Sequence, residues 1–463
     1  MSEFLSELRG LLGPEAVVGP QALRERARNH WDSSPLEARA LVRPGSTAQL
    51  AQVLRWCHER RQSVVVHGGL TGVCDGDRAS AQDLVVSLER MSEIEEIDPI
   101  GRTVRVQAGC RLQRLQEAVE AQGLLLPLDL GARGSCTIGG NVATNAGGIN
   151  VIRFGMMRAL VLGLEAVLAD GSVVSSLNTM LKNNAGYDLK QLFIGSEGTL
   201  GIVTRVVLAL KERSRSIDTA LVALDRGEHL AALLKHMDQR LGGTLSSYEA
   251  MWGRYFRAVT EPGGHVAPLE RHHPYYVIVE AQGPEPQSDA LRFERAIEEA
   301  LAAGLIVDAV IPKSGAERAR IWAIRENFEA LLRHRPLFLY DVSLPIRSML
   351  EYVAGVEQAI EREWKGGELF VLGHLGDGNL HFFVAPHVKA GDPAALHARS
   401  DEIVYAPLRA IGGSVSAEHG IGLEKKAWLA RSRSPAELEL MRTLKRALDP
   451  HGILNRGKVI DPA

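Results

Sequence analysis

The chain has few cysteines, and none of them forms a Cys-x-x-Cys pair within its 463 residues. Cys57, Cys74, Cys110 and Cys136 are scattered along the sequence. Disulfide scaffolds, iron–sulfur clusters and cysteine-rich zinc sites need closely spaced cysteines, so this spacing argues against all of these classes. Isolated thiols fit a reducing compartment, and we therefore expect a cytoplasmic protein.

The sequence also lacks long apolar runs and any strong excess of one charge. No apolar stretch approaches the ~20 residues of a membrane-spanning helix, so we expect no transmembrane segment. The formal net charge of -3 gives no reason to expect nucleic acid as a partner. The N-terminal residues include acids where a secretory signal has basic residues, which argues against such a signal.

Short β-rich runs alternate with amphipathic helical patterns from Ala40 onwards, which predicts an α+β protein. Ser46 can cap a helix, and the run from Val64 to Val66 reads as a buried strand. The charged segment from Lys211 to Arg215 is the predicted domain boundary. The length is sufficient for two or three domains with large cores.

The segment from Gly373 to His381 reads Gly-His-Leu-Gly-Asp-Gly-Asn-Leu-His and contains ordinary metal ligands. Its Asp-Gly pair predicts a two-residue hairpin turn, which would place His374 directly opposite His381. Directly opposed residues have Cβ atoms ~5 Å apart and can share one metal ion. Together with the Glu418 carboxylate they make a three-ligand site with open positions, which suits zinc. The alternative is a hairpin with two solvated histidines.

The centre of the chain is rich in glycine: residues 138–148 hold four glycines and two asparagines. Exposed backbone N–H groups with Thr and Asn side chains form a cradle for pyrophosphate oxygens. Gly68–Gly72 and Gly195–Gly201 offer further loops of this kind. Neither a GxGxxG nor a Walker pattern is present, so a Rossmann or P-loop site is not predicted. A large phosphate-bearing cofactor is favoured over a glycine-rich turn or lid.

These motifs together resemble those of a flavoprotein family. The glycine-rich centre and the segment 194–202 resemble the FAD-binding domain of vanillyl-alcohol oxidase/p-cresol methylhydroxylase-type flavoproteins. The segments 374–381, 416–422 and 453–458 resemble the C-terminal domain of FAD-linked D-2-hydroxy acid dehydrogenases. That group includes D-lactate dehydrogenase, D-2-hydroxyglutarate dehydrogenase and the glycolate oxidase flavin subunit. The resemblance runs from about Arg39 to the C-terminus.

The resemblance implies an FAD-binding domain of the vanillyl-alcohol oxidase type, built from two subdomains, and an α+β cap domain with an antiparallel sheet. The expected domains are a helical leader (1–38), the FAD-binding domain (39–212), a substrate and cap domain with the metal site (213–425), and a C-terminal segment that returns to the flavin (426–463).

Carried over position by position, the family's cofactor contacts fall on residues in six parts of the chain. The implied FAD-binding residues are Gly68, Gly69, Leu70, Thr71, Gly72, Pro127, Leu128, Asp129, Thr137, Ile138, Gly139, Gly140, Asn141, Thr144, Asn145, Glu197, Gly198, Thr199, Ile202, His419 and Asn455. Some relatives attach FAD through a histidine just after the paired glycines. Leu70 occupies that position here, so we expect non-covalent FAD, with His67 supporting the loop.

The implied reaction oxidises a D-2-hydroxy acid to a 2-oxo acid, with the hydroxyl proton removed and the Cα hydride passed to flavin. A divalent metal, with zinc favoured, lowers the pKa of the hydroxyl; His374, His381 and Glu418 are its expected ligands. His419 is the expected general base, with a purely structural histidine as the alternative.

The substrate carboxylate needs a cation, and Arg325 matches the family's substrate-binding arginine. The alternative is a surface arginine that pairs with Glu329 at i+4. Lys458 is either a flavin-side cation or a surface lysine of the C-terminal segment.

The expected partners follow from this chemistry. A small 2-hydroxy acid is the substrate, and a separate acceptor, a quinone or an electron-transfer protein, takes the electrons. A homodimer is a possible assembly of this chain. D-2-hydroxyglutarate-specific relatives usually carry a lysine, an asparagine and a threonine-type residue where this chain has Leu339, Phe383 and Glu329. We therefore expect a D-lactate-like substrate. D-2-hydroxyglutarate, a glycolate oxidase-type subunit acting in a complex, and a non-catalytic zinc or nucleotide binder remain alternatives.

Overall fold

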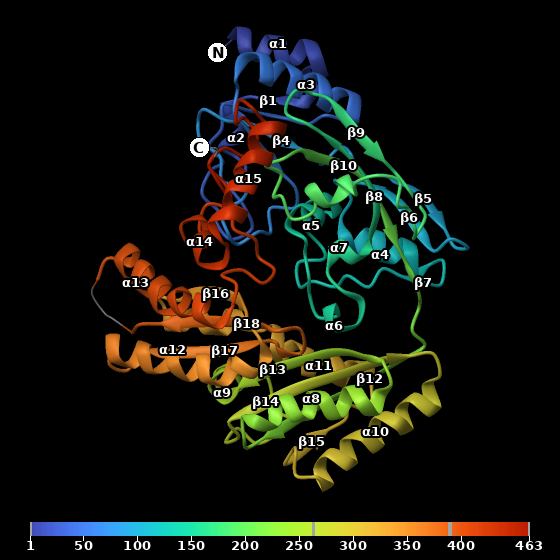
Figure 1. Ribbon diagram of the computed structural model, residues 1–463, viewed down its shortest axis with the longest axis vertical. Helices are drawn as coiled ribbons and strands as arrows, with labels where there is room; N and C mark the ends of the chain where they lie inside the picture. The colour runs from blue at the N-terminus through green and yellow to red at the C-terminus, as the bar shows by residue number, and fades with distance from the viewer. Residues whose placement is uncertain (1, 262–263, 388–390, 462–463) are drawn as a thin grey trace. The chain divides into compact units, whose positions relative to one another are not determined.

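The computed structural model describes residues 2–261, 264–387 and 391–461 (Figure 1). The chain divides into two compact units. The first unit comprises residues 1–147, 155–213 and 418–463. The second comprises residues 148–154 and 214–417. The expected leader and C-terminal segment both belong to the first unit.

The first unit contains a four-stranded sheet in the order β1-β2-β4-β3. Its strands are β1 (Val17–Val18), β2 (Ala40–Val42), β3 (Val64–His67) and β4 (Leu84–Ser87). Val64 and Val86 face one core, and Val65 and Val85 face another. Both faces are buried, which explains the unbroken apolar runs of these strands. The leader supplies β1 as well as helix α1 (Ser2–Leu12), so it is not purely helical.

A second sheet of the first unit has five antiparallel strands in the order β5-β6-β10-β8-β9. The strands are β5 (Ile94–Asp98), β6 (Thr103–Gln107), β8 (Val161–Val167), β9 (Val173–Ser176) and β10 (Ile202–Ala209). Helices α3 (Thr47–Arg60), α4 (Leu112–Glu120) and α5 (Ile138–Thr144) pack into the same core. As predicted, Ser46 caps α3, because its side chain accepts a hydrogen bond from Gln49 N.

The C-terminal segment contains α15 (Pro435–Leu448) and then runs beside β3. Val64 N donates to Ile453 O over 2.8 Å, and Asn455 N donates to Val64 O over 2.8 Å. The end of the chain therefore extends the four-stranded sheet and lies next to the loop that follows β3.

The second unit is built on a seven-stranded antiparallel sheet in the order β15-β12-β14-β13-β17-β18-β16. Its strands are β12 (Ser216–Leu224), β13 (Leu245–Trp252), β14 (Tyr275–Gly283), β15 (Asp308–Val310), β16 (Phe338–Ser343), β17 (Glu368–His374) and β18 (Asn379–Ala385). The predicted α+β class and antiparallel cap sheet are confirmed.

Helices cover both faces of this sheet. Helices α8 (Glu228–Leu241), α10 (Pro286–Ala302) and α12 (Met349–Glu363) lie along one face (Figure 1). Tyr248 points to this face and donates a hydrogen bond to Leu230 O. Helices α9 (Gly253–Thr260) and α11 (Gly315–Glu326) and the 3₁₀ segment η3 (Phe328–His334) pack on the other face. Because side chains alternate along a strand, Glu249 faces this second side, and the candidate site is built there.

Candidate functional site

The β17–β18 hairpin carries both histidines of the predicted metal motif, but its register differs from the predicted one. His381 pairs with Leu372, and residues Leu375–Asp377 form a 3₁₀ turn. A type I′ turn needs positive φ at both central residues, and here only Gly378, with φ 91°, has it. The predicted direct opposition of His374 and His381 is therefore wrong. They are diagonal neighbours on one face, with ring centroids 5.3 Å apart.

His374 belongs to a buried group with Glu249 and Arg325. His374 Nδ1 lies 2.7 Å from Glu249 Oε1, and Arg325 Nε donates to Glu249 Oε2 over 2.9 Å. Arg325 Nη2 lies 3.3 Å from His374 Nε2. The Arg325 side chain is only 13% exposed, so the alternative of a surface arginine is wrong.

Glu249 is the residue of this group that sequence reasoning missed. Burial by itself raises the pKa of its carboxyl, but the charges and hydrogen bonds of His374 and Arg325 outweigh burial, and its pKa lies below the ordinary value. Glu249 is 1% exposed and pairs with His374 across β13 and β17. A single charged residue within an otherwise uncharged strand is the signal that could have pointed to it.

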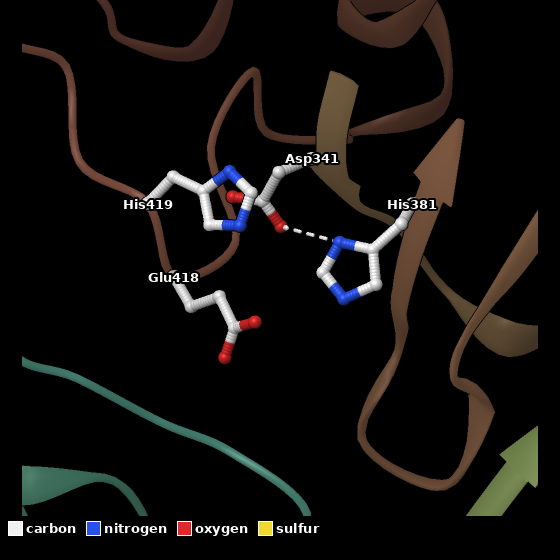
Figure 2. Close-up of side chains that lie close together, drawn as sticks. All are labelled: Asp341, His381, Glu418 and His419. Carbon is white, nitrogen blue, oxygen red and sulfur yellow. Dashed lines mark ion pairs between the residues drawn. The ribbon is translucent and has the colours of Figure 1, made fainter. Parts of the chain in front are cut away.

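A second group gathers around His381 (Figure 2). Asp341, His381, Glu418 and His419 each offer one ligand atom, and these atoms all lie within 4.8 Å of one another. Asp341 is the register partner of His381 on β16, and its Oδ1 lies 3.7 Å from His381 Nδ1. Glu418 and His419 directly follow Ala417, the last residue of the second unit's chain segments.

Asp341 was not among the predicted site residues, although it is the one charged residue of its strand. Its side chain is fully buried. It accepts hydrogen bonds from Asn379 Nδ2 over 2.8 Å and from Ala417 N over 3.0 Å. These bonds hold the carboxylate against the Nδ1 side of the His381 ring. Asp341 thereby also ties the backbone just before Glu418 to the strand that carries His381.

The chemistry of this donor set fits a divalent metal. In metal sites, a histidine ligand usually directs its other ring nitrogen at a carboxylate. His374 Nδ1 lies at hydrogen-bond distance from Glu249, and His381 Nδ1 faces Asp341 at the longer distance of 3.7 Å. Each Nε2 is therefore the nitrogen suited to a ligand, although that of His374 must first release its 3.3 Å contact with Arg325 Nη2. His381 and Glu418 lie in the four-residue group, and His374 lies beside it. Imidazole and carboxylate donors are those that zinc and similar ions take.

In the first unit, the backbone of the glycine-rich segments packs closely against neighbouring parts of the chain. A Cβ on Gly69 would lie 2.3 Å from Ser135 O, and one on Gly68 would lie 2.8 Å from Thr137 Oγ1. A Cβ on Gly139 would lie 2.7 Å from Ala108 Cβ. The loop after β3 and the start of α5 therefore approach each other at a distance that only glycine allows.

The predicted cofactor residues from distant parts of the chain also meet in this unit. Asn455 Oδ1 accepts from Val66 N over 3.1 Å, and Asn455 Nδ2 donates to Glu197 O over 2.6 Å. The Glu197 carboxylate accepts from Ile421 N and Gly422 N. The β3 loop, the segment around Glu197 and the C-terminal segment are thus joined. Leu128 is buried in the same unit, and Leu70 takes a positive φ of 57°.

Several buried side-chain atoms of this unit have no hydrogen-bond partner in the described part of the chain, and the donors among them include Lys458 Nζ and Asn141 Nδ2. Lys458 is 2% exposed, so the alternative of a surface lysine is wrong. Burial lowers its pKa to about 8 in spite of Asp77 and Glu197. Unpaired buried donors are costly, and oxygen atoms of an FAD molecule would satisfy them. The residues present therefore fit FAD.

His67, directly before the paired glycines, supports the loop as expected. Its Nε2 lies 2.8 Å from Asp77 O, and burial lowers its pKa to about 4. The imidazole is therefore neutral at physiological pH and engaged by the chain itself.

Beside the polar residues, the same face of the second unit's sheet is apolar. Leu339 lies opposite Phe383, and each stands two residues from a site residue, Asp341 or His381. The four side chains therefore share one face. Phe328 of η3 stacks on Phe383 with ring centroids 6.2 Å apart.

Family comparisons agree with this architecture. Residues 213–459 match the family described as FAD linked oxidases, C-terminal domain, and residues 38–176 match the FAD binding domain. The fold is similar to that of p-cresol methylhydroxylase, with a TM-score of 0.78 at 16% identity over 99% of this chain and 97% of that chain. The predicted fold type is confirmed, and the chain belongs to the FAD-linked oxidase family.

Curated relatives narrow the class. The chain is 38% identical to the mitochondrial D-2-hydroxyglutarate dehydrogenase of Bos taurus, over 98% of this chain and 83% of that protein. It is 39% identical to the D-2-hydroxyglutarate dehydrogenase of Xanthomonas citri pv. viticola, over 93% and 90%. It is 33% identical to a Schizosaccharomyces pombe protein named for D-lactate dehydrogenase, over 89% and 80%. Within its family the chain is an FAD-dependent dehydrogenase of D-2-hydroxy acids.

The described residues contain no helix with the length and apolar character needed to cross a membrane. Several relatives are named as mitochondrial proteins, and the cytoplasmic location stays a prediction.

Proposed function

We propose that this protein oxidises D-2-hydroxyglutarate to the 2-oxo acid. The names of most similar relatives favour this substrate over the D-lactate-like acid that the sequence favoured. The observation that supports the chemistry most directly is the grouping of His381, Glu418 and His419 with Asp341, whose ligand atoms lie within 4.8 Å of one another.

Each side chain has a distinct role in this proposal. His374, His381 and Glu418 hold the metal, while Glu249 and Asp341 orient the two imidazoles through Nδ1. When bound, the metal supplies Lewis acidity and FAD supplies the hydride acceptor.

The substrate is bound and deprotonated by this chain's own residues. The Arg325 guanidinium binds the carboxylate next to the reacting carbon, because a planar fork matches a carboxylate. A ring nitrogen of His419 accepts the hydroxyl proton, and its place beside Glu418 keeps it near the metal ligands. In the first unit, Lys458 and Asn141 bind FAD oxygens.

Anaerobic reduction of the bound flavin tests the proposal. The purified yellow protein is mixed with D- and L-2-hydroxyglutarate and D- and L-lactate, with and without a chelator. We expect rapid bleaching by D-2-hydroxyglutarate, little by the L-acids, and a slower rate after chelation. Bleaching by none of the acids contradicts the dehydrogenase function, and a rate unaffected by metal removal contradicts the role given to the metal ligands.

A D-2-hydroxy acid with a short apolar side chain, such as D-lactate, is the second candidate. Leu339, Phe383 and Phe328 form an apolar surface on the same sheet face as His381. An apolar surface provides no hydrogen-bond donor or cation for a second substrate carboxylate, and burying a carboxylate without such a partner costs free energy. Faster flavin reduction by D-lactate than by D-2-hydroxyglutarate would favour this candidate.

The electrons leave the reduced flavin for a separate acceptor, a quinone or an electron-transfer protein, in this proposal. Steady turnover of the isolated chain with an artificial dye tests whether it works without a partner subunit. A requirement for a second polypeptide would favour the glycolate oxidase-type alternative.

A further inference from the structure

A second group of metal-ligating side chains lies within the second unit, apart from the group around His381. His334 is the last residue of η3, Glu368 is the first residue of β17, and His387 follows the end of β18. Their ligand atoms also lie within 4.8 Å of one another. None of these residues has a part in the proposed reaction. Glu368 and His374 stand at opposite ends of β17, six residues or ~20 Å apart at ~3.3 Å per residue.

Both imidazoles converge on one carboxylate oxygen. His387 Nε2 lies 2.5 Å from Glu368 Oε2, and His334 Nδ1 lies 3.1 Å from the same atom. The rings of His334 and His387 are 5.6 Å apart and nearly perpendicular. Two imidazoles directed at one carboxylate oxygen are the donors of a three-ligand zinc site with open positions.

Packing positions these side chains before any ion binds. The His334 ring packs on Phe370 with centroids 4.7 Å apart, which leaves its side chain 19% exposed. His387 has a φ of 54°, a left-handed conformation that a histidine seldom adopts. This backbone conformation brings the His387 ring back towards the first residue of β17. Glu368 is 32% exposed and His387 is 35% exposed, so an ion can reach them from solvent.

We propose that His334, Glu368 and His387 bind a divalent transition metal ion, with zinc as the test ion. The site ties the end of η3 to the open end of the β17–β18 hairpin. These two segments also carry Phe328 and the histidines of the candidate active site. The ion therefore acts as a structural link that fixes η3 against the hairpin, and it takes no part in the chemistry.

The adjustment that binding requires is small. Zinc bonds of ~2.0–2.2 Å place tetrahedral ligands ~3.3–3.5 Å apart, so His387 must move outward by less than ~1 Å. Coordination through His334 Nδ1 moves the ring proton to Nε2, which displaces the 3.2 Å contact with Arg333 Nε. Arg333 is 46% exposed and keeps its bonds to Ala258 O and Glu261. The loss of one contact at a half-exposed side chain is a modest cost.

Metal content of the untagged full-length protein tests the proposal. The protein is equilibrated with zinc in slight excess, dialysed and analysed for zinc and FAD together. We expect about two zinc ions per chain for the wild type and about one for His387→Ala, with a normal FAD content in both. Glu368→Gln gives a second variant in case His387→Ala does not fold.

Two further variants separate the sites. His381→Ala removes a ligand of the proposed active site and should retain the second ion while losing flavin reduction. His272→Ala is the matched control, because His272 is exposed and pairs with Glu270 but belongs to neither group. It should keep both ions. His387→Ala should keep flavin reduction by substrate within about twofold, and added zinc should no longer raise its melting temperature.

The results that overturn the proposal are distinct from those that overturn the proposed function. A wild type that binds one ion, lost in His381→Ala, contradicts the second site and leaves the active site intact. Two ions retained in both His387→Ala and Glu368→Gln contradict it as well. Failure of every acid to bleach the flavin concerns only the proposed function.

Discussion

Replacing Arg325 by methionine tests the buried charge group at the candidate site. Glu249 is 1% exposed and the Arg325 side chain is 13% exposed, so solvent screens their interaction weakly. Removing one partner of a buried ion pair costs ~3–5 kcal/mol, because the other charge remains buried and unpaired. His374 keeps one bond to Glu249, so we expect the lower end, a loss of ~3 kcal/mol in the free energy of unfolding.

The double variant Arg325→Met/Glu249→Gln supplies the control. A neutral amide no longer requires a buried cation, so the double variant should be more stable than Arg325→Met alone. Urea unfolding, followed by tryptophan fluorescence, measures the wild type, the single variants Arg325→Met and Glu249→Gln, and the double variant. A loss below ~1 kcal/mol for Arg325→Met, or strictly additive losses in the double variant, would refute the reasoning about a coupled buried charge.

The same pair predicts a pH dependence. The pKa of Glu249 is lower in the folded protein than its ordinary value of 4.5, so folding favours the ionised form. The stability that ionisation supplies is present above pH 4.5 and is lost as the pH falls through the lower folded pKa. The stability difference between wild type and Arg325→Met should therefore be full at pH 7 and shrink as the pH falls below 4.5 towards the folded pKa.

Three other predictions address the cofactor, the imidazole and the substrate. Lys458→Met should weaken FAD binding ~10–100-fold, since a charge-assisted hydrogen bond contributes ~1.5–3 kcal/mol. Titration of the apoprotein with FAD measures the affinity, and Lys458→Arg should retain part of it. Asp341→Asn should lower metal affinity or flavin reduction ~10–100-fold with unchanged FAD content, and an unaltered metal titration would contradict the orienting role of Asp341. Leu339→Lys should raise the ratio of the flavin-reduction rates with D-2-hydroxyglutarate and D-lactate at least ~10-fold, because a cation then faces the second carboxylate. Leu337→Lys, two residues away, is the control and should leave this ratio unchanged.

The sequence alone identified the family and the α+β class, and it predicted residues for the cofactor and metal sites. Motifs such as the paired glycines at Gly68 and the histidines at His374 and His381 are local, and their chemistry depends on residue type and short spacing. Non-covalent FAD, the metal ligands and the general base remain predictions, although the structure brings most of these residues together.

Only the tertiary structure decided the register of the hairpin and the partners of the histidines. The hairpin register depends on backbone dihedrals at Asp377 and Gly378, which residue type restricts but does not determine. Glu249 and Asp341 reach the histidines through strand pairing across 125 and 40 residues of sequence. Contacts of that range depend on which strands become neighbours, and no periodicity within a single segment encodes that choice.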